Sequence, residues 1–185
     1  MAAVILAAGS ATRFGSPKQL ARVGDLTMLE AVVAIAREAG LDPILAVVPG
    51  ALAVPPDVVP VRNDDPERGL SHSLQMGIAA LPGDVEAALM LLGDQPTLPV
   101  ATVNAIVAAR GSRPIVAASS GGLILPPVLV ERSAFDSVAL LHGDLGLREI
   151  IRGNRQVVRE VPVDAIPADV DTPADLERLG SSGSV

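Results

Sequence analysis

The stretch Ala2-Ala3-Val4-Ile5-Leu6-Ala7-Ala8-Gly9 decides the fold class of this chain. It is a continuous apolar run that ends at a glycine, which is typical of a strand buried on both faces. Strands of this kind belong to sheets that are covered by helices on both sides. A polar loop follows as far as Pro17, and the first helix is expected at 27–39, where Thr27 and Glu30 have the spacing of a capping box.

The rest of the chain alternates between strand patterns and helix patterns. Further strands are expected at 43–48, 58–62, 86–92, 114–118 and 156–163, and further helices at 70–81, 99–110, 128–141, 145–151 and from Thr172 onward. The segment 119–127 contains glycine and proline and is expected to be irregular. This alternation predicts an α/β sandwich around a mostly parallel sheet, in which ligands bind at the carboxyl ends of the strands. We expect a single domain over residues 1–180 and a disordered tail at 181–185.

The composition argues against several classes of function. The formal net charge is −7, so the protein gains nothing from a nucleic-acid backbone. Its two aromatic side chains, Phe14 and Phe135, are too few for a platform on which single strands stack. The chain has no cysteine, which excludes disulfides and thiolate chemistry. The first apolar run is too short for a membrane span or a signal peptide, and we expect a cytoplasmic protein with neither nucleic-acid nor membrane partners.

The loop after the first strand combines glycines with positive charge. It reads Leu6-Ala7-Ala8-Gly9-Ser10-Ala11-Thr12-Arg13-Phe14-Gly15-Ser16-Pro17-Lys18-Gln19-Leu20. Glycines let a backbone approach a ligand closely, and exposed N–H groups can bind phosphate oxygens beside Arg13 and Lys18. Lys18 is the only lysine among 14 basic residues, and a compact ammonium on a flexible stem suits tasks that arginine performs poorly. The spacing fits neither a Walker A loop nor a Gly-x-Gly-x-x-Gly dinucleotide fingerprint. The alternative is a flexible loop that is basic without a function.

Aspartates are prominent in two further segments, and the first of them is a candidate for holding a metal ion. Asp94 follows the apolar strand in Leu91-Leu92-Gly93-Asp94-Gln95-Pro96, and Mg²⁺ prefers one or two carboxylates together with substrate phosphates. The second segment reads Asp169-Val170-Asp171-Thr172-Pro173-Ala174-Asp175. Each segment also has a purely structural interpretation: Asp94 as a turn residue, and Thr172 with Asp175 as the start of a helix.

Taken together, these segments resemble the MobA-like nucleotidyltransferases. The first loop matches their signature at Leu6, Ala8, Gly9, Arg13, Gly15 and Lys18, and the resemblance extends from Ala2 to about Leu179. It implies a Rossmann-like three-layer sandwich of the nucleotide-diphospho-sugar transferase type. It also implies that Lys18, Arg13 and Asp94 are catalytic and that Asp94 and Asp171 hold Mg²⁺, with Asp169 as the second choice after Asp171. The nucleotide-binding residues that it implies are Leu6, Ala7, Ala8, Gly9, Ser10, Arg13, Gly15, Lys18, Asn63, Gly69 and Ser73.

Two further segments bear on the branch of that family. His142-Gly143-Asp144-Leu145-Gly146-Leu147-Arg148 resembles a sequence typical of the molybdenum cofactor cytidylyltransferases, which makes Asp144 and Arg148 candidate acceptor-binding residues. Their alternatives are a helix cap and a surface cation. Where that branch usually has Gly-His-Pro-Val, this chain has Leu125 and Pro126 in place of the first two residues. This departure concerns the side of the site that binds the acceptor.

The resemblance implies a Mg²⁺-dependent transfer of a nucleoside monophosphate from an NTP to a phosphorylated acceptor, with release of pyrophosphate. Ala8 favours CTP over GTP, and the expected acceptor is the molybdenum pterin cofactor, with a molybdoenzyme or its maturation factor as a further partner. The alternatives are a guanylyltransferase for the same or a phospholactate-type acceptor, and a relative that binds a nucleotide or cofactor without turnover.

Overall fold

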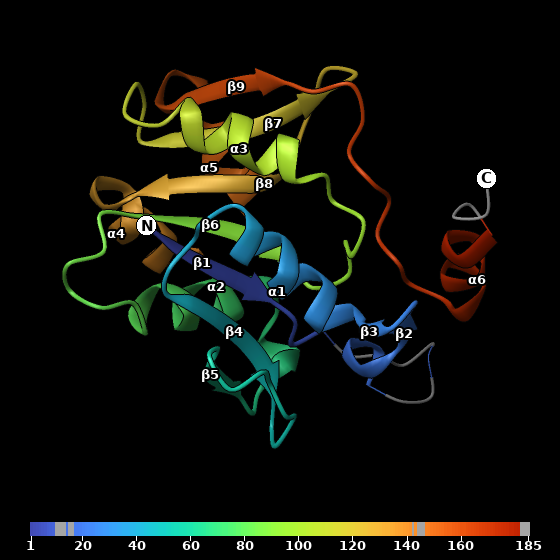
Figure 1. The fold of residues 1–185 in the computed structure, drawn as a ribbon. Helices are drawn as coiled ribbons and strands as arrows, with labels where there is room; N and C mark the ends of the chain where they lie inside the picture. Colours follow the sequence, from blue (N-terminus) through green and yellow to red (C-terminus); the bar gives the residue numbers. More distant parts are fainter. Residues whose placement is uncertain (10–13, 15–16, 142, 144–146, 182–185) are drawn as a thin grey trace.

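The computed structural model describes residues 1–9, 14, 17–141, 143 and 147–181, and it has an α/β architecture (Figure 1). Its main sheet has seven strands in the order β5-β4-β1-β6-β8-β7-β9. The strands are β1 (Ala2–Leu6), β4 (Ile44–Pro49), β5 (Val59–Asn63), β6 (Ala87–Leu92), β7 (Ile115–Ser120), β8 (Leu123–Glu131) and β9 (Val158–Pro162). All of them run in one direction except β8, which is antiparallel to both of its neighbours. The mostly parallel sheet expected from the sequence is confirmed.

Helices cover both faces of this sheet and form the outer two of three layers (Figure 1). On one face lie α1 (Met28–Glu38) and α3 (Val100–Ala108); on the other lie α2 (Leu70–Ala79), α4 (Phe135–Ala139) and α5 (Leu147–Gly153). Successive residues of β1 point to opposite faces, so that Ala3 and Ile5 belong to one hydrophobic core while Ala2 and Val4 belong to the other. This explains why the β1 sequence is apolar at every position.

Helix α1 begins where the sequence predicts. The Thr27 hydroxyl accepts a hydrogen bond from the Glu30 backbone N–H at 3.2 Å, and the Glu30 carboxylate accepts one from the Thr27 backbone N–H at 2.7 Å. This reciprocal capping box satisfies two N–H groups that the first turn leaves without partners. A short hairpin of β2 (Arg22–Val23) and β3 (Leu26–Thr27) precedes the helix; its turn uses Gly24 at a φ of 60°. The hairpin was not expected from the sequence, because two-residue strands are too short to show a period.

The segment 119–141 differs from the sequence-based expectation. Residues 123–131 form β8 instead of an irregular segment followed by a helix, and only Phe135–Ala139 is helical. The pairing of β7 with β8 passes from Ala117↔Val128 to Ala118↔Leu125, so Pro126 and Pro127 bulge out of the ladder. Proline lacks the N–H that a ladder needs, and a bulge is one of the few places where a strand tolerates it. The run Val128-Leu129-Val130 is apolar throughout because β8 lies between β6 and β7, and such a short run does not distinguish a buried strand from a helix.

The chain returns to the carboxyl ends of the strands after β9. Residues 163–172 form a segment without regular structure that leads to α6 (Pro173–Ser181), and α6 contacts β2 (Figure 1). The Val170 N–H donates to the Asp94 carbonyl at 2.9 Å, which fastens this segment beside the end of β6. Within the described residues, no helix has the length and apolar character needed to cross a membrane.

The loop after β6 packs closely against the end of β1. The Gly93 N–H donates to the Leu6 carbonyl at 2.9 Å, and a Cβ atom added at Gly93 would lie 2.7 Å from the Cβ of Ala7 and 3.2 Å from its Cα. A side chain at position 93 would therefore force the two loops apart, since a backbone atom cannot move aside as a flexible side chain does.

We expect Gly93→Ala to lower the free energy of unfolding by about 1–3 kcal/mol, which is the usual cost of overpacking a well-packed position. Urea denaturation followed by circular dichroism would measure it. Gly83→Ala is the matched control, because a Cβ atom there meets nothing within 4 Å. If the two variants unfold at the same urea concentration, the contact between the loops is not as close as described.

Candidate functional site

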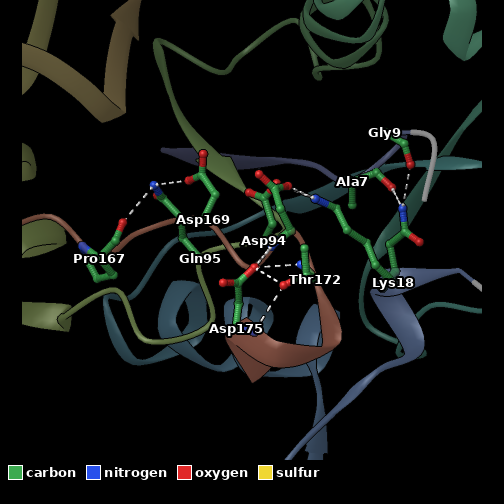
Figure 2. A network of polar contacts seen from close by, with 11 residues as sticks. Ala7, Gly9, Lys18, Asp94, Gln95, Pro167, Asp169, Thr172 and Asp175 are labelled. Atoms are coloured by element: carbon green, nitrogen blue, oxygen red, sulfur yellow. Dashed lines mark hydrogen bonds and ion pairs between the residues drawn. The ribbon is translucent and has the colours of Figure 1, made fainter. Parts of the chain in front are cut away.

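A lysine ammonium lies between two aspartates at the carboxyl ends of β1 and β6. The Lys18 Nζ donates to Asp94 Oδ2 at 2.7 Å and to Asp171 Oδ1 at 3.2 Å (Figure 2). Lys18 begins a single turn of 3-10 helix, Asp94 follows β6, and Asp171 lies in the segment before α6. Three parts of the chain that are distant in sequence therefore meet at one cation. The Lys18 side chain is 15% exposed, and Asp171 is the most open of the three at 53%.

Neighbouring charges shift the pKa values of Lys18 and Asp169. Burial by itself lowers the pKa of Lys18, but the hydrogen bonds and negative charges of Asp94 and Asp171 outweigh it, so the pKa lies above its ordinary value. Lys18 is therefore positively charged at neutral pH. Asp169 lies on the other side of Asp94 and accepts a hydrogen bond from Gln95 Nε2 at 2.9 Å. Desolvation of its carboxylate and the charge of Asp94 raise the pKa of Asp169.

Glutamine side chains hold the backbone around these charges. Gln19 is buried, and its Nε2 donates to the carbonyls of Ala7 and Gly9, which fixes the start of the first loop (Figure 2). Gln95 is also buried and contacts the segment before α6 through Asp169 and, at 3.4 Å, through the Pro167 carbonyl. Neither residue was singled out from the sequence. Their position in the sequence could have identified them, because Gln19 directly follows Lys18 and Gln95 directly follows Asp94.

Asp171 is positioned by the start of α6. The Asp175 carboxylate accepts hydrogen bonds from the N–H of Thr172 at 2.7 Å, the hydroxyl of Thr172 at 2.7 Å and the N–H of Asp171 at 3.1 Å. The helix-start interpretation of this motif is thus correct, and the same contacts orient the residue that reaches Lys18. The segment can therefore begin a helix and contribute Asp171 to the site at the same time.

The Asn63 and Ser73 side chains contact each other at the edge of the site. Asn63 Nδ2 donates to the Ser73 hydroxyl at 3.0 Å, and Asn63 Oδ1 accepts from the N–H of Asp65 at 3.0 Å. Asn63 is fully buried, so in this structure it orders the loop after β5 and orients Ser73. Ser73 and Gly69 line a cavity beside the first loop.

Two adjoining cavities lie beside the aspartates, the smaller lined by Asp94 and the larger by Asp169. The smaller, of about 260 Å³, lies along the first loop and is lined by Ala7, Ala8, Gly9, Lys18, Ser73 and Asp94, among others. The larger, of about 710 Å³, is lined mainly by aliphatic side chains, together with Arg152, Gln95 and Asp169. Leu6, Leu70 and Leu92 line both cavities. Leu125 and Pro126, next to the bulge of β8, line the larger one.

Most of the residues expected at the site are thereby brought together. Leu6, Ala7, Ala8, Gly9, Lys18, Gly69, Ser73 and Asp94 line the smaller cavity, and Asp171 meets Lys18. Ser10, Arg13, Gly15 and Asp144 lie outside the described residues. Arg148 belongs to α5, but its side chain is also outside what the structure describes.

The chain is similar to known proteins in both sequence and structure. The family model "MobA-like NTP transferase domain" matches residues 3–160. The crystal structure of the Rv0371c homolog from Mycobacterium sp. strain JC1 is 35% identical and has a TM-score of 0.87; the match covers 98% of this chain and 95% of that one. The manganese complex of Rv0371C from Mycobacterium tuberculosis H37Rv is 33% identical, with a TM-score of 0.80 and 98% coverage of both chains.

A curated relative is the bifunctional protein GlmU of Hyphomonas neptunium, which is 38% identical over 113 residues. The match covers 56% of this chain and only 24% of GlmU, so the chain spans about a quarter of that relative's length. The family model, by contrast, matches well over half of this chain, from β1 into β9. The protein belongs to the MobA-like NTP transferase domain family.

Proposed function

We propose that this protein transfers a nucleoside monophosphate from an NTP to a small phosphorylated acceptor and releases pyrophosphate. The observation that carries the proposal is the cluster of Lys18, Asp94 and Asp171, in which Lys18 and Asp94 line the smaller of two adjoining cavities. The smaller cavity, beside the first loop, would take the triphosphate, and the larger cavity would take the acceptor. Family membership supports this assignment, as does the position of the cluster at the carboxyl edge of a parallel sheet.

The aspartates fit a divalent cation. A cation already fits between Asp94 and Asp171, since the Lys18 ammonium contacts both. The three carboxylates of Asp94, Asp169 and Asp171 exceed the single charge of Lys18, and Asp94 Oδ1 is buried without a hydrogen-bond partner among the described residues. Asp94 and Asp171 would hold Mg²⁺, a metal that usually binds through one or two carboxylates and substrate phosphates. When bound, it would neutralise charge on the triphosphate. The Rv0371C relative crystallised with manganese supports a divalent metal here.

The protein's own residues need to align and neutralise the reactants. Both reactants are anions, and the acceptor phosphate supplies the nucleophilic oxygen, so no protein nucleophile is needed. Lys18 would bind the triphosphate from the smaller cavity, and Arg13 is proposed as a second positive charge for it. The bond from the acceptor oxygen to the α-phosphorus forms as the bond to pyrophosphate breaks. Gln19 and Gly93 keep the two loops in place during this step.

We further propose CTP as the nucleotide and the molybdenum pterin cofactor as the acceptor, within a single domain. Ala8 is almost fully buried and lines the smaller cavity, where its methyl group would crowd a purine more than a pyrimidine. The larger cavity has room for a bulky acceptor with an apolar face, since its walls are mostly aliphatic. A guanylyltransferase and a binding protein without turnover are the alternatives, and the two experiments that follow distinguish them.

Asp94→Asn should lower pyrophosphate release about a hundredfold or more, because it weakens the carboxylate that would hold the Mg²⁺ needed to neutralise charge on the triphosphate. The assay would combine each of CTP, GTP, ATP and UTP with Mg²⁺ and the molybdenum pterin cofactor. Asp84→Asn is the control, since Asp84 is an exposed aspartate at the opposite end of β6. Release with GTP alone would move the proposal to the guanylyl alternative. Tight nucleotide binding without any release would favour the binding protein.

Ala8→Gly should weaken discrimination against GTP by up to about 1–3 kcal/mol, the range that one methyl group in a pocket provides. Calorimetric titration of CTP, UTP and GTP with Mg²⁺ would measure this. The ratio of CTP to UTP affinities is an internal control, because both bases are pyrimidines of the same ring size. An unchanged ratio of CTP to GTP affinities would show that Ala8 does not select the base.

A further inference from the structure

Lys18 occupies the place that a divalent cation would need. Its ammonium contacts both carboxylates that would hold the metal, at 2.7 Å from Asp94 and 3.2 Å from Asp171. Two cations at one point repel each other strongly in a partly buried site. The side chain is 15% exposed, so solvent screens this repulsion only in part.

The two oxygens of Asp94 are not equivalent. Oδ1 is buried, whereas Oδ2 is the oxygen that accepts from Lys18. A cation that arrives from solvent therefore reaches Asp94 at the oxygen that the ammonium already occupies. Asp171 is more exposed, but it is shared with the same ammonium.

A second position is also available to the Lys18 ammonium. Lys18 lines the smaller cavity together with Asp94, so the space proposed for the triphosphate lies beside its ammonium. The backbone beside it is held in place, since the neighbouring Gln19 is buried and anchored to Ala7 and Gly9. Movement of the ammonium would thus be confined to the flexible four-carbon stem of lysine.

We propose that Lys18 is a built-in cation that keeps the metal site closed until a nucleotide arrives. In the nucleotide-free protein it neutralises Asp94 and Asp171; when an NTP binds, the ammonium moves to the phosphates and frees the carboxylates for the metal that accompanies the nucleotide. This inference rests on the proposed function, because it takes a triphosphate to draw the lysine away. It assigns a binding order to the site in addition to the role of Lys18 toward phosphate.

The exchange makes metal and nucleotide binding cooperative. Displacing the ammonium from the carboxylates costs free energy, and this cost arises only once when both ligands bind. Each ligand therefore raises the affinity for the other by the same factor. A neutral side chain at position 18 would remove this coupling. It would open the metal site in the absence of nucleotide and weaken the binding of the triphosphate.

The test is Mn²⁺ binding without nucleotide, measured as the loss of the free-ion signal in electron paramagnetic resonance. Lys18→Met should bind Mn²⁺ at least about tenfold more tightly than the unaltered protein, since it removes a positive charge within contact distance of both carboxylates. Arg37→Met is the matched control: it also removes one positive charge, from an exposed pair with Asp57 at the far end of α1, and should leave Mn²⁺ affinity unchanged. The double variant Lys18→Met/Asp94→Asn should lose the gain.

A second arm adds the α,β-methylene analogue of CTP or of GTP, which cannot release pyrophosphate. The unaltered protein should then bind Mn²⁺ more tightly than without the analogue, and Lys18→Met should show little further change. If Lys18→Met binds Mn²⁺ no more tightly than the unaltered protein while the analogue still binds with the metal, the exchange is wrong and the proposed function stands. If neither analogue binds, the proposed function fails, and the exchange fails with it. Thermal unfolding of each variant would verify that it is folded.

Discussion

The arrangement of this site depends on the parallel hydrogen bonding of β1 to β6. Their register pairs Leu6 with Leu92, so the two strands end side by side, and the residues that follow them must lie close together. The first loop leaves from one strand and Asp94 follows the other. The Gly93 N–H bonds the Leu6 carbonyl, and the absence of a side chain at Gly93 lets the loops touch. Two segments about 80 residues apart in sequence thus become one surface through backbone geometry alone.

Lys18 adds the third segment to that surface. The stretch before α6 crosses from the β9 edge of the sheet, bonds the Asp94 carbonyl through Val170 and presents Asp171 to the ammonium. Without a positive charge there, Asp94, Asp169 and Asp171 would repel one another; burial and, after it, the negative charges of Asp94 and Asp171 raise the pKa of Asp169. The cation therefore has a structural role as well as a chemical one: it lets a group of carboxylates stay together before any ligand has bound. The family model ends at residue 160, so the Asp171 carboxylate comes from a part of the chain that the model does not match.

The larger cavity reflects a different constraint, the insertion of β8 between β6 and β7. An antiparallel strand in this place needs a turn at Gly121-Gly122, both with positive φ, and it passes two prolines by bulging at Pro126 and Pro127. Leu125, which precedes this bulge, and Pro126, which belongs to it, lie in the wall of the cavity proposed for the acceptor. The departure of this chain from the Gly-His-Pro-Val pattern therefore falls on that wall and leaves the cluster of Lys18, Asp94 and Asp171 as it is.

The sequence by itself determined the α/β class, the start of α1 and the candidates Lys18 and Asp94, because each depends on local information, whereas Asp171 was identified from the resemblance to the family. A continuous apolar run, a capping box and a charged residue after a buried strand can all be recognised within about ten residues. Only the tertiary structure decided that 123–131 is a strand, that Gln19 and Gln95 anchor the loops, and that one ammonium contacts two aspartates. These features depend on which strands are neighbours and on the distances between segments far apart in the chain, and neither local periodicity nor residue type encodes such distances.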